Sequence, residues 1–147
     1  MEAPHLAVIV PAYDEAARML PTLERLAAYF AAQPYSWSVT VVSDGSMDGT
    51  NAIVEEFAAG HEAFALLAYS PNRGKGYAVR KGMLEVPGEL VLFSDADLAA
   101  PIEEVEKLLP KLEEGFDIAI GSRPLKESRL EVRQPWFREM MGRAFNF

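Results

Sequence analysis

Five short apolar runs recur along this chain, and stretches long enough for helices separate them. The runs occupy residues 6–10, 37–42, 64–69, 90–93 and 116–120, and each leads into a polar or glycine-containing segment. Runs of this length are typical of buried strands. The order β-α-β-α-β-α-β-α-β predicts an α/β domain with a mostly parallel central sheet and helices on both faces. The expected helices cover residues 21–33, about 50–59, 75–85, 101–114 and 135 onward.

Composition limits the classes of function. The 147 residues, half of them apolar, suit one domain over residues 1–147 with a sizeable core. A net charge of −8 argues against nucleic acid as a partner, and the absence of cysteine excludes disulfides and thiolate metal sites. No apolar run approaches the ~20 residues that span a bilayer, and the N-terminus has no positively charged leader, so a cytoplasmic location is expected.

The triplet Asp95-Ala96-Asp97 comes just after the apolar run Leu90–Phe93. Because successive strand residues point to opposite faces, this spacing predicts that both carboxylates point the same way. Two close carboxylates repel each other unless a cation lies between them, and Mg²⁺ or Mn²⁺ prefers oxygen ligands. A metal–diphosphate site is therefore expected here. A polar turn before a helix at Pro101 is the structural alternative.

Two earlier strand ends carry further ligand-capable residues, and ligands gather at such ends in open α/β sheets. After the first run, Tyr13 offers a ring for stacking and Glu15 an acceptor; a proline turn is the alternative. After the second run, Asp44 is expected to accept a hydrogen bond from a nucleotide base or ribose. Ser46 and Asp48 are expected to be turn and cap residues of a helix that Gly60 stops.

The third run leads into Gly74-Lys75-Gly76, which opens a helix. Glycine lets the backbone approach an anion, the helix N-terminus attracts it, and Lys75 adds positive charge. The segment is neither a P-loop nor a Rossmann fingerprint, whose third glycine falls on Val79. A helix start with a solvated lysine is the alternative. A single polar strand end can be explained as a turn. Four polar strand ends, all expected at the same edge of the sheet, are harder to explain in this way.

Four segments in this order carry a resemblance to a known family: Val8–Glu15, Ser43–Thr50, Asn72–Gly76 and Asp95–Asp97. With them the chain resembles the family 2 inverting glycosyltransferases of the GT-A fold, and most of all the dolichyl- or polyprenyl-phosphate glucosyltransferases. The closing stretch of residues 121–146 supports that subgroup. The resemblance covers nearly the whole chain, although family catalytic domains continue past this length.

The resemblance implies roles for particular residues. Asp95 and Asp97 are the implied catalytic and metal-binding pair for Mg²⁺ or Mn²⁺, with Asp97 the more direct ligand. Asp44 is implied to bind the base or ribose, and Arg123 to face phosphate groups. The implied substrate-binding set is Pro11, Ala12, Tyr13, Glu15, Asp44, Gly74, Lys75, Gly76, Asp95, Ala96, Asp97 and Arg123.

Three positions depart from the family pattern. Asp14 stands where asparagine is usual, Ser43 replaces the first aspartate of Asp-Asp-Gly-Ser, and Ala99 stands where a polar residue is common. None of them touches the expected metal or base ligands.

The activity implied by the resemblance is metal-dependent transfer of a hexose from a nucleotide-sugar, UDP-glucose favoured, to dolichyl or polyprenyl phosphate with inversion. A phosphate monoester has a second pKa of about 6, so such an acceptor is already anionic and needs no evident general base. The absence of an evident general base is equally explained if that base lies in sequence that this chain does not contain. The alternatives are a mannosyltransferase using GDP-mannose, a non-catalytic nucleotide-sugar-binding fragment, and a dehydrogenase or NTPase whose motifs this chain lacks.

The charge is unevenly distributed. Eight basic against 19 acidic residues give residues 1–122 a charge of −11, whereas six basic against three acidic residues give residues 123–147 a charge of +3. We expect Arg129, Arg133, Arg138 and Arg143 to serve the lipid-phosphate acceptor at the cytoplasmic membrane face. Pairing of these arginines with the acidic body of the domain is the alternative.

Overall fold

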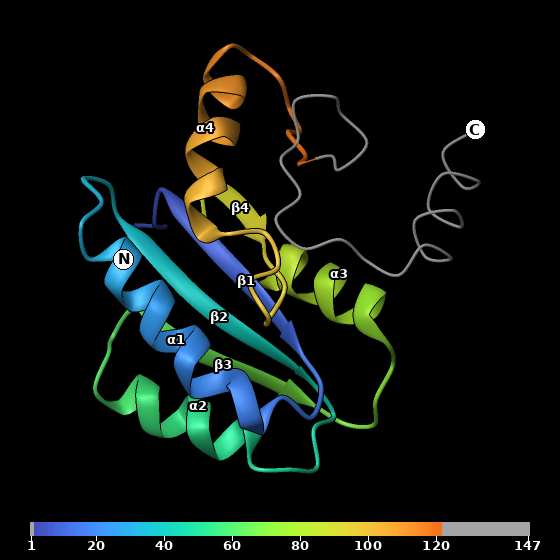
Figure 1. Cartoon of the computed structure of the whole chain (residues 1–147). Coiled ribbons are helices and arrows are strands. Elements are labelled where there is room, and N and C mark those ends of the chain that lie inside the picture. The colour runs from blue at the N-terminus through green and yellow to red at the C-terminus, as the bar shows by residue number, and fades with distance from the viewer. Residues whose placement is uncertain (1, 122–147) are drawn as a thin grey trace, which may run out of the picture. The chain divides into compact units, whose positions relative to one another are not determined.

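The computed structural model describes residues 2–121 of the chain (Figure 1). A parallel sheet of four strands has the order β3-β2-β1-β4, with β1 at Leu6–Ala12, β2 at Trp37–Asp44, β3 at Phe64–Tyr69 and β4 at Leu90–Phe93. Helices α1 (Ala16–Phe30), α2 (Thr50–Ala59) and α3 (Lys75–Glu85) connect successive strands. The predicted α/β class and parallel sheet are confirmed.

The chain divides into two compact units, residues 1–103 and 104–147. The first holds the sheet and helices α1 to α3. The short 3₁₀ helix Ile102–Glu104 lies at the division, and α4 (Val105–Glu113) belongs to the second unit. Gly115, with a φ of 100°, follows the C-cap residue of α4. A single domain over residues 1–147 stays a prediction. Among the described residues, no helix has both the length and the hydropathy needed to cross a bilayer.

Strand β1 is the centre of the core. Every residue from Leu6 to Ala12 is buried, because β1 pairs with β2 on one side and with β4 on the other. On one face of the sheet, aromatic rings join strands to helices: Phe30 of α1 stacks on Trp37, and Phe57 of α2 meets Phe64 edge to face. Helix α3 packs on the other face, where Ala78 lies with Ile9 and Val42.

Three strand predictions require correction. Pro11 and Ala12 are part of β1, not of the following loop, since β2 continues alongside them to Asp44. Strand β4 is partly exposed, with Phe93 44% exposed, because it occupies the edge of the described sheet. Residues 116–120 form no strand: within residues 2–121 they pair with no neighbour, and their alternating apolar side chains at Phe116, Ile118 and Ile120 are exposed.

Two helix predictions also require correction. Helix α1 begins at Ala16, five residues before the predicted start at Pro21, because the loop after β2 supplies hydrogen-bond acceptors to its first amide groups. The predicted helix over residues 101–114 is a 3₁₀ turn followed by α4.

Helix α3 approaches the sheet at Gly82, and this contact gives a stability prediction. A Cβ atom at Gly82 would lie 2.5 Å from Ile9 Cγ2 and 3.0 Å from Val42 Cγ2. Gly82→Ala should therefore lower the free energy of unfolding by about 1–3 kcal/mol in urea denaturation. The matched variant Gly76→Ala, on the same helix with nothing within 4 Å, should be neutral or stabilising by up to about 1 kcal/mol. Equal effects of the two substitutions would contradict this packing.

Candidate functional site

A cavity of about 420 Å³ opens at the carboxyl edge of the sheet, within the first compact unit. It brings together residues that are up to 86 positions apart in the chain, from the ends of β1, β2, β3 and β4. Its lining residues are Pro11, Ala12, Tyr13, Glu15, Asp44, Asn72, Gly74, Lys75, Asp95, Ala96 and Asp97. Of the predicted substrate-binding residues only two are missing from this list: Gly76 does not line the cavity, and Arg123 lies outside the described residues.

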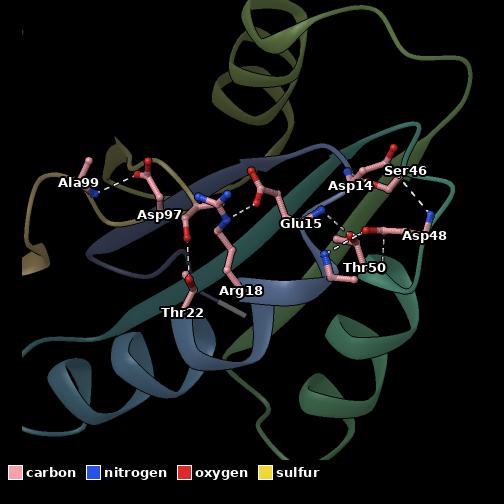
Figure 2. Close-up of polar contacts among 11 residues, drawn as sticks. Asp14, Glu15, Arg18, Thr22, Ser46, Asp48, Thr50, Asp97 and Ala99 are labelled. Atoms are coloured by element: carbon pink, nitrogen blue, oxygen red, sulfur yellow. Dashed lines mark hydrogen bonds and ion pairs between the residues drawn. The ribbon is translucent and has the colours of Figure 1, made fainter. Parts of the chain in front are cut away.

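The two carboxylates reach the cavity from a turn and not from a strand. Strand β4 ends at Phe93, and the amide of Leu98 donates to the Asp95 carbonyl at 3.0 Å to close the turn. Asp97 Oδ1 accepts a hydrogen bond from the Ala99 amide at 2.9 Å (Figure 2). The strand-alternation argument for the Asp-x-Asp spacing is thus wrong, although both side chains line the same cavity.

Helix α1 holds this turn in place. The Thr22 hydroxyl donates to the Ala96 carbonyl at 2.6 Å, and both residues are buried. A buried carbonyl without a donor costs about 1–3 kcal/mol, so the contact fixes the peptide between the two carboxylates relative to the helix. Nothing in the sequence alone marks Thr22, which lies within an apolar helical stretch.

The residues present fit a divalent ion that is shared with a diphosphate. The donors are two carboxylates, the hard oxygen ligands that Mg²⁺ and Mn²⁺ prefer. Lys75 Nζ lies 2.5 Å from Asp95 Oδ1, so a cationic group already neutralises one of them. Residues 2–121 contain no cluster of three or more His, Cys, Asp or Glu side chains suited to a metal. Such a two-carboxylate site suits an ion that takes its remaining ligands from phosphate and water.

Asp44 is buried at the end of β2, and its carboxylate organises the loop after β3. It accepts hydrogen bonds from the amides of Arg73 and Gly74, both at 2.7 Å. Gly74 has a φ of 92°, a conformation that favours glycine, and it precedes the first residue of α3. Burial, together with the neighbouring Asp44 carboxylate, raises the pKa of Tyr69 further above neutral pH.

A second hollow of about 650 Å³ shares Tyr13 and Asn72 with the first. It is lined by the loops after β2 and β3 and by Asn51 of α2. The buried Asn51 Oδ1 has no hydrogen-bond partner among the described residues. Asn72 donates from its side chain to the Asp44 carbonyl at 3.0 Å. The sequence motif contains Asn72, but no role was predicted for it.

The start of α1 depends on the neighbouring loop for its caps (Figure 2). The Glu15 amide donates to Thr50 Oγ1 at 2.9 Å, and the Ala16 amide donates to Asp48 Oδ2 at 3.0 Å. The Glu15 side chain pairs with Arg18 at 2.6 Å. Asp48 also accepts from the Thr50 amide at 2.9 Å, next to Gly49 at the N-cap position of α2. Asp48 was expected to cap one helix, but it accepts hydrogen bonds from the first amide groups of both α1 and α2.

Comparison with known proteins agrees with this arrangement. A model of the family described as glycosyl transferase family 2 matches residues 7–142. The chain belongs to this family. Curated relatives include a dolichyl-phosphate beta-glucosyltransferase of Trichomonas vaginalis, 36% identical over 94% of this chain and 44% of its own length. The Drosophila melanogaster dolichyl-phosphate beta-glucosyltransferase is 37% identical over 97% of this chain and 48% of its own length. The chain thus spans less than half the length of these family 2 relatives.

Solved structures show the same fold. A mannosyltransferase from Pyrobaculum calidifontis in complex with GDP-Man and Mn²⁺ is 31% identical, with a TM-score of 0.59 over 72% of this chain and 31% of its own. S. aureus TarS in complex with UDP is 30% identical, with a TM-score of 0.55 over 66% of this chain and 28% of its own. These likenesses confirm the predicted family and its GT-A fold.

The shared caps predict how stability depends on pH. The hydroxyl of Thr50, together with the Thr50 and Ala16 amides, lowers the pKa of Asp48. A carboxyl with a depressed folded-state pKa stabilises the fold above its unfolded value of about 3.9, and this contribution disappears as pH falls through the folded value. Wild type should therefore have a higher Tm than Asp48→Asn at pH 7, and the difference should shrink towards pH 3. Thermal unfolding at both pH values measures this, and a pH-independent difference would contradict it.

Proposed function

We propose that this chain binds a nucleoside diphosphate sugar in the 420 Å³ cavity and belongs to an enzyme that transfers the hexose to a dolichyl or polyprenyl phosphate with inversion. One observation carries the proposal. Four strand ends and the segments that follow them, from separate parts of the chain, bring ten of the twelve predicted ligand residues to one cavity. Relatives named dolichyl-phosphate beta-glucosyltransferase support the acceptor class.

The proposed nucleoside end lies beside Tyr13. This side chain is 50% exposed and lines both hollows, so one face of its ring is accessible for stacking on a base. Carboxylate oxygens each have two acceptor sites, so Asp44 retains acceptor capacity for a base or ribose after binding two amides.

The proposed diphosphate end lies between the start of α3 and the Asp95–Asp97 turn. Asp95 and Asp97 would hold the divalent ion, with the Thr22 contact fixing the peptide between them. When bound, such an ion stabilises the charge that develops on the leaving diphosphate. Lys75 and the positive end of the α3 dipole add fixed positive potential at the same place.

The acceptor phosphate needs little activation, since its second pKa of about 6 leaves it anionic at neutral pH. Neither histidine of the chain lines the cavity: His5 pairs with Glu89, and His61 bonds the Phe57 carbonyl. The proposal places the lipid acceptor near Arg123 and the basic stretch 123–147, which lie outside the described residues. A lipid acceptor requires contact with a membrane surface, for which we propose the cytoplasmic face.

Two alternatives remain. A mannosyl donor is favoured by the likeness to the Pyrobaculum calidifontis protein solved with GDP-Man and Mn²⁺. A donor-binding fragment without turnover is the second alternative, and the chain spans 44% and 48% of the length of two relatives. Incubation with Mn²⁺, polyprenyl phosphate and either UDP-glucose or GDP-mannose separates them. Formation of glycolipid from one of the two donors supports transfer and identifies the sugar. Donor binding without product supports a non-catalytic donor-binding fragment.

Metal dependence gives a direct prediction. Mn²⁺ should tighten UDP or GDP binding at least tenfold relative to EDTA, because two carboxylates and a diphosphate repel one another without a cation. Asp97→Asn should remove most of this gain while the circular dichroism spectrum stays unchanged. The control Glu89→Gln, whose carboxylate pairs with His5 away from the cavity, should keep it. Equal nucleotide affinity with metal and with EDTA in wild type would argue against the site.

Loss of the Lys75 charge should have opposite effects on the affinity for the metal ion and on the affinity for the nucleotide. Its ammonium group neutralises Asp95 in the ligand-free chain, and an exposed pair of this kind contributes about 0–1 kcal/mol. Lys75→Met should therefore bind Mn²⁺ alone up to about fivefold more tightly, yet bind UDP or GDP more weakly, because the diphosphate loses a cation. Lys81→Met removes a lysine that pairs with Glu85 on the same helix and should change neither affinity. Calorimetry measures the affinities for Mn²⁺ and for the nucleotide. A change of both affinities in the same direction would contradict this role of Lys75.

A further inference from the structure

We propose that Asp14 is a positioning residue that fastens the loop after β1 to the loop after β2 and thereby fixes Tyr13 and Glu15 for the nucleotide. Asp14 does not line the cavity, and its side chain is exposed, so it acts through its neighbours in the chain. The inference rests on the proposed function for the role of Tyr13 and Glu15, whereas the loop connection itself rests on the contacts alone.

Asp14 contacts three consecutive residues of the second loop. Its Oδ1 accepts hydrogen bonds from the Met47 amide at 2.8 Å and the Asp48 amide at 3.3 Å. Its own amide donates to Ser46 Oγ at 3.1 Å (Figure 2). The Ser46 hydroxyl is also 2.9 Å from Ser43 Oγ at the end of β2. The Asp14 side chain thus binds two successive backbone amides of the neighbouring loop, and the Asp14 backbone amide binds a third residue of that loop.

The backbone at Asp14 adds a second demand. Its φ of 50° is in the left-handed region, where aspartate and asparagine are tolerated far better than most residues with a Cβ atom. This conformation turns the chain between Tyr13, which is half exposed and lines both hollows, and Glu15, the N-cap residue of α1. Position 14 therefore requires a residue that accepts this φ and also presents a short acceptor.

The hydrogen bonds after Asp14 continue the same connection. The Glu15 amide binds Thr50 Oγ1 and the Ala16 amide binds Asp48 Oδ2, so the three consecutive amides from Asp14 to Ala16 find acceptors between Ser46 and Thr50. Because Asp14 Oδ1 holds the Asp48 amide, it also sets the position of the carboxylate that caps α1. Release of Asp14 should let both cavity-lining residues, Tyr13 and Glu15, change direction.

Two substitutions separate the acceptor from the backbone conformation. Asp14→Gly accepts a positive φ but removes the acceptor, whereas Asp14→Asn keeps both a tolerated φ and an Oδ1 acceptor. Amide hydrogen exchange of the ligand-free chain should be about tenfold faster at Met47, Asp48 and Glu15 in Asp14→Gly, and within about twofold of wild type in Asp14→Asn. Unchanged exchange in Asp14→Gly would overturn the connection, whatever the chain binds.

Calorimetry tests the positioning role. In Asp14→Gly, UDP with saturating Mn²⁺ should bind about tenfold more weakly, while Mn²⁺ alone should bind as in wild type, because the Asp95–Asp97 turn is held separately by Thr22. Asp14→Asn should restore UDP affinity. Equal UDP affinity in Asp14→Gly and wild type, or a parallel loss of both ligands, would overturn the positioning role. If wild type binds neither UDP nor GDP, the proposed function fails, and hydrogen exchange still decides the loop connection.

Discussion

The parallel pairing of β1 on both of its edges is the constraint on which the rest of the structure depends. Leu6 to Ala12 pair with β2 over seven positions, and Leu6 to Ile9 pair with β4 over four. Because all four strands run the same way, their carboxyl ends meet at one edge. The loops that follow are polar, and each is short enough to stay at that edge. One cavity therefore collects residues from the whole length of the first compact unit.

Hydrogen bonds between segments far apart in the sequence position the residues that line this cavity. The first amides of α1 are capped by Asp48 of the next loop and by Thr50 at the start of α2. The turn between Asp95 and Asp97 is held by Thr22, and the start of α3 is held by Asp44. Each of these bonds joins segments that follow, or end, different strands of the sheet. The parallel sheet brings the loops together, and these bonds fix their relative positions.

Much of this arrangement was predictable from the sequence, since buried runs of four to six residues and polar strand ends have local signatures. Those signatures placed Asp44, Lys75 and Asp95 in one site. The contacts made by Thr22, Asn72 and Asp48 were not predictable, because they join residues 28–74 positions apart through single hydrogen bonds that leave no periodic pattern. Residues 116–120 show the opposite error: their apolar alternation is typical of a strand, but a strand needs a partner.

The central claim is that a metal–nucleotide complex binds at the carboxyl edge of the sheet. Paramagnetic broadening of amide resonances by Mn²⁺ in the presence of UDP tests it most directly, because the broadening reports distance from the ion. The account predicts that the amides of Asp95, Ala96 and Asp97 broaden first, followed by Gly74 and Lys75, while those of Leu6 and Trp37 at the amino ends of the strands stay sharp. Broadening centred on His5 and Glu89, at the opposite edge, would contradict it.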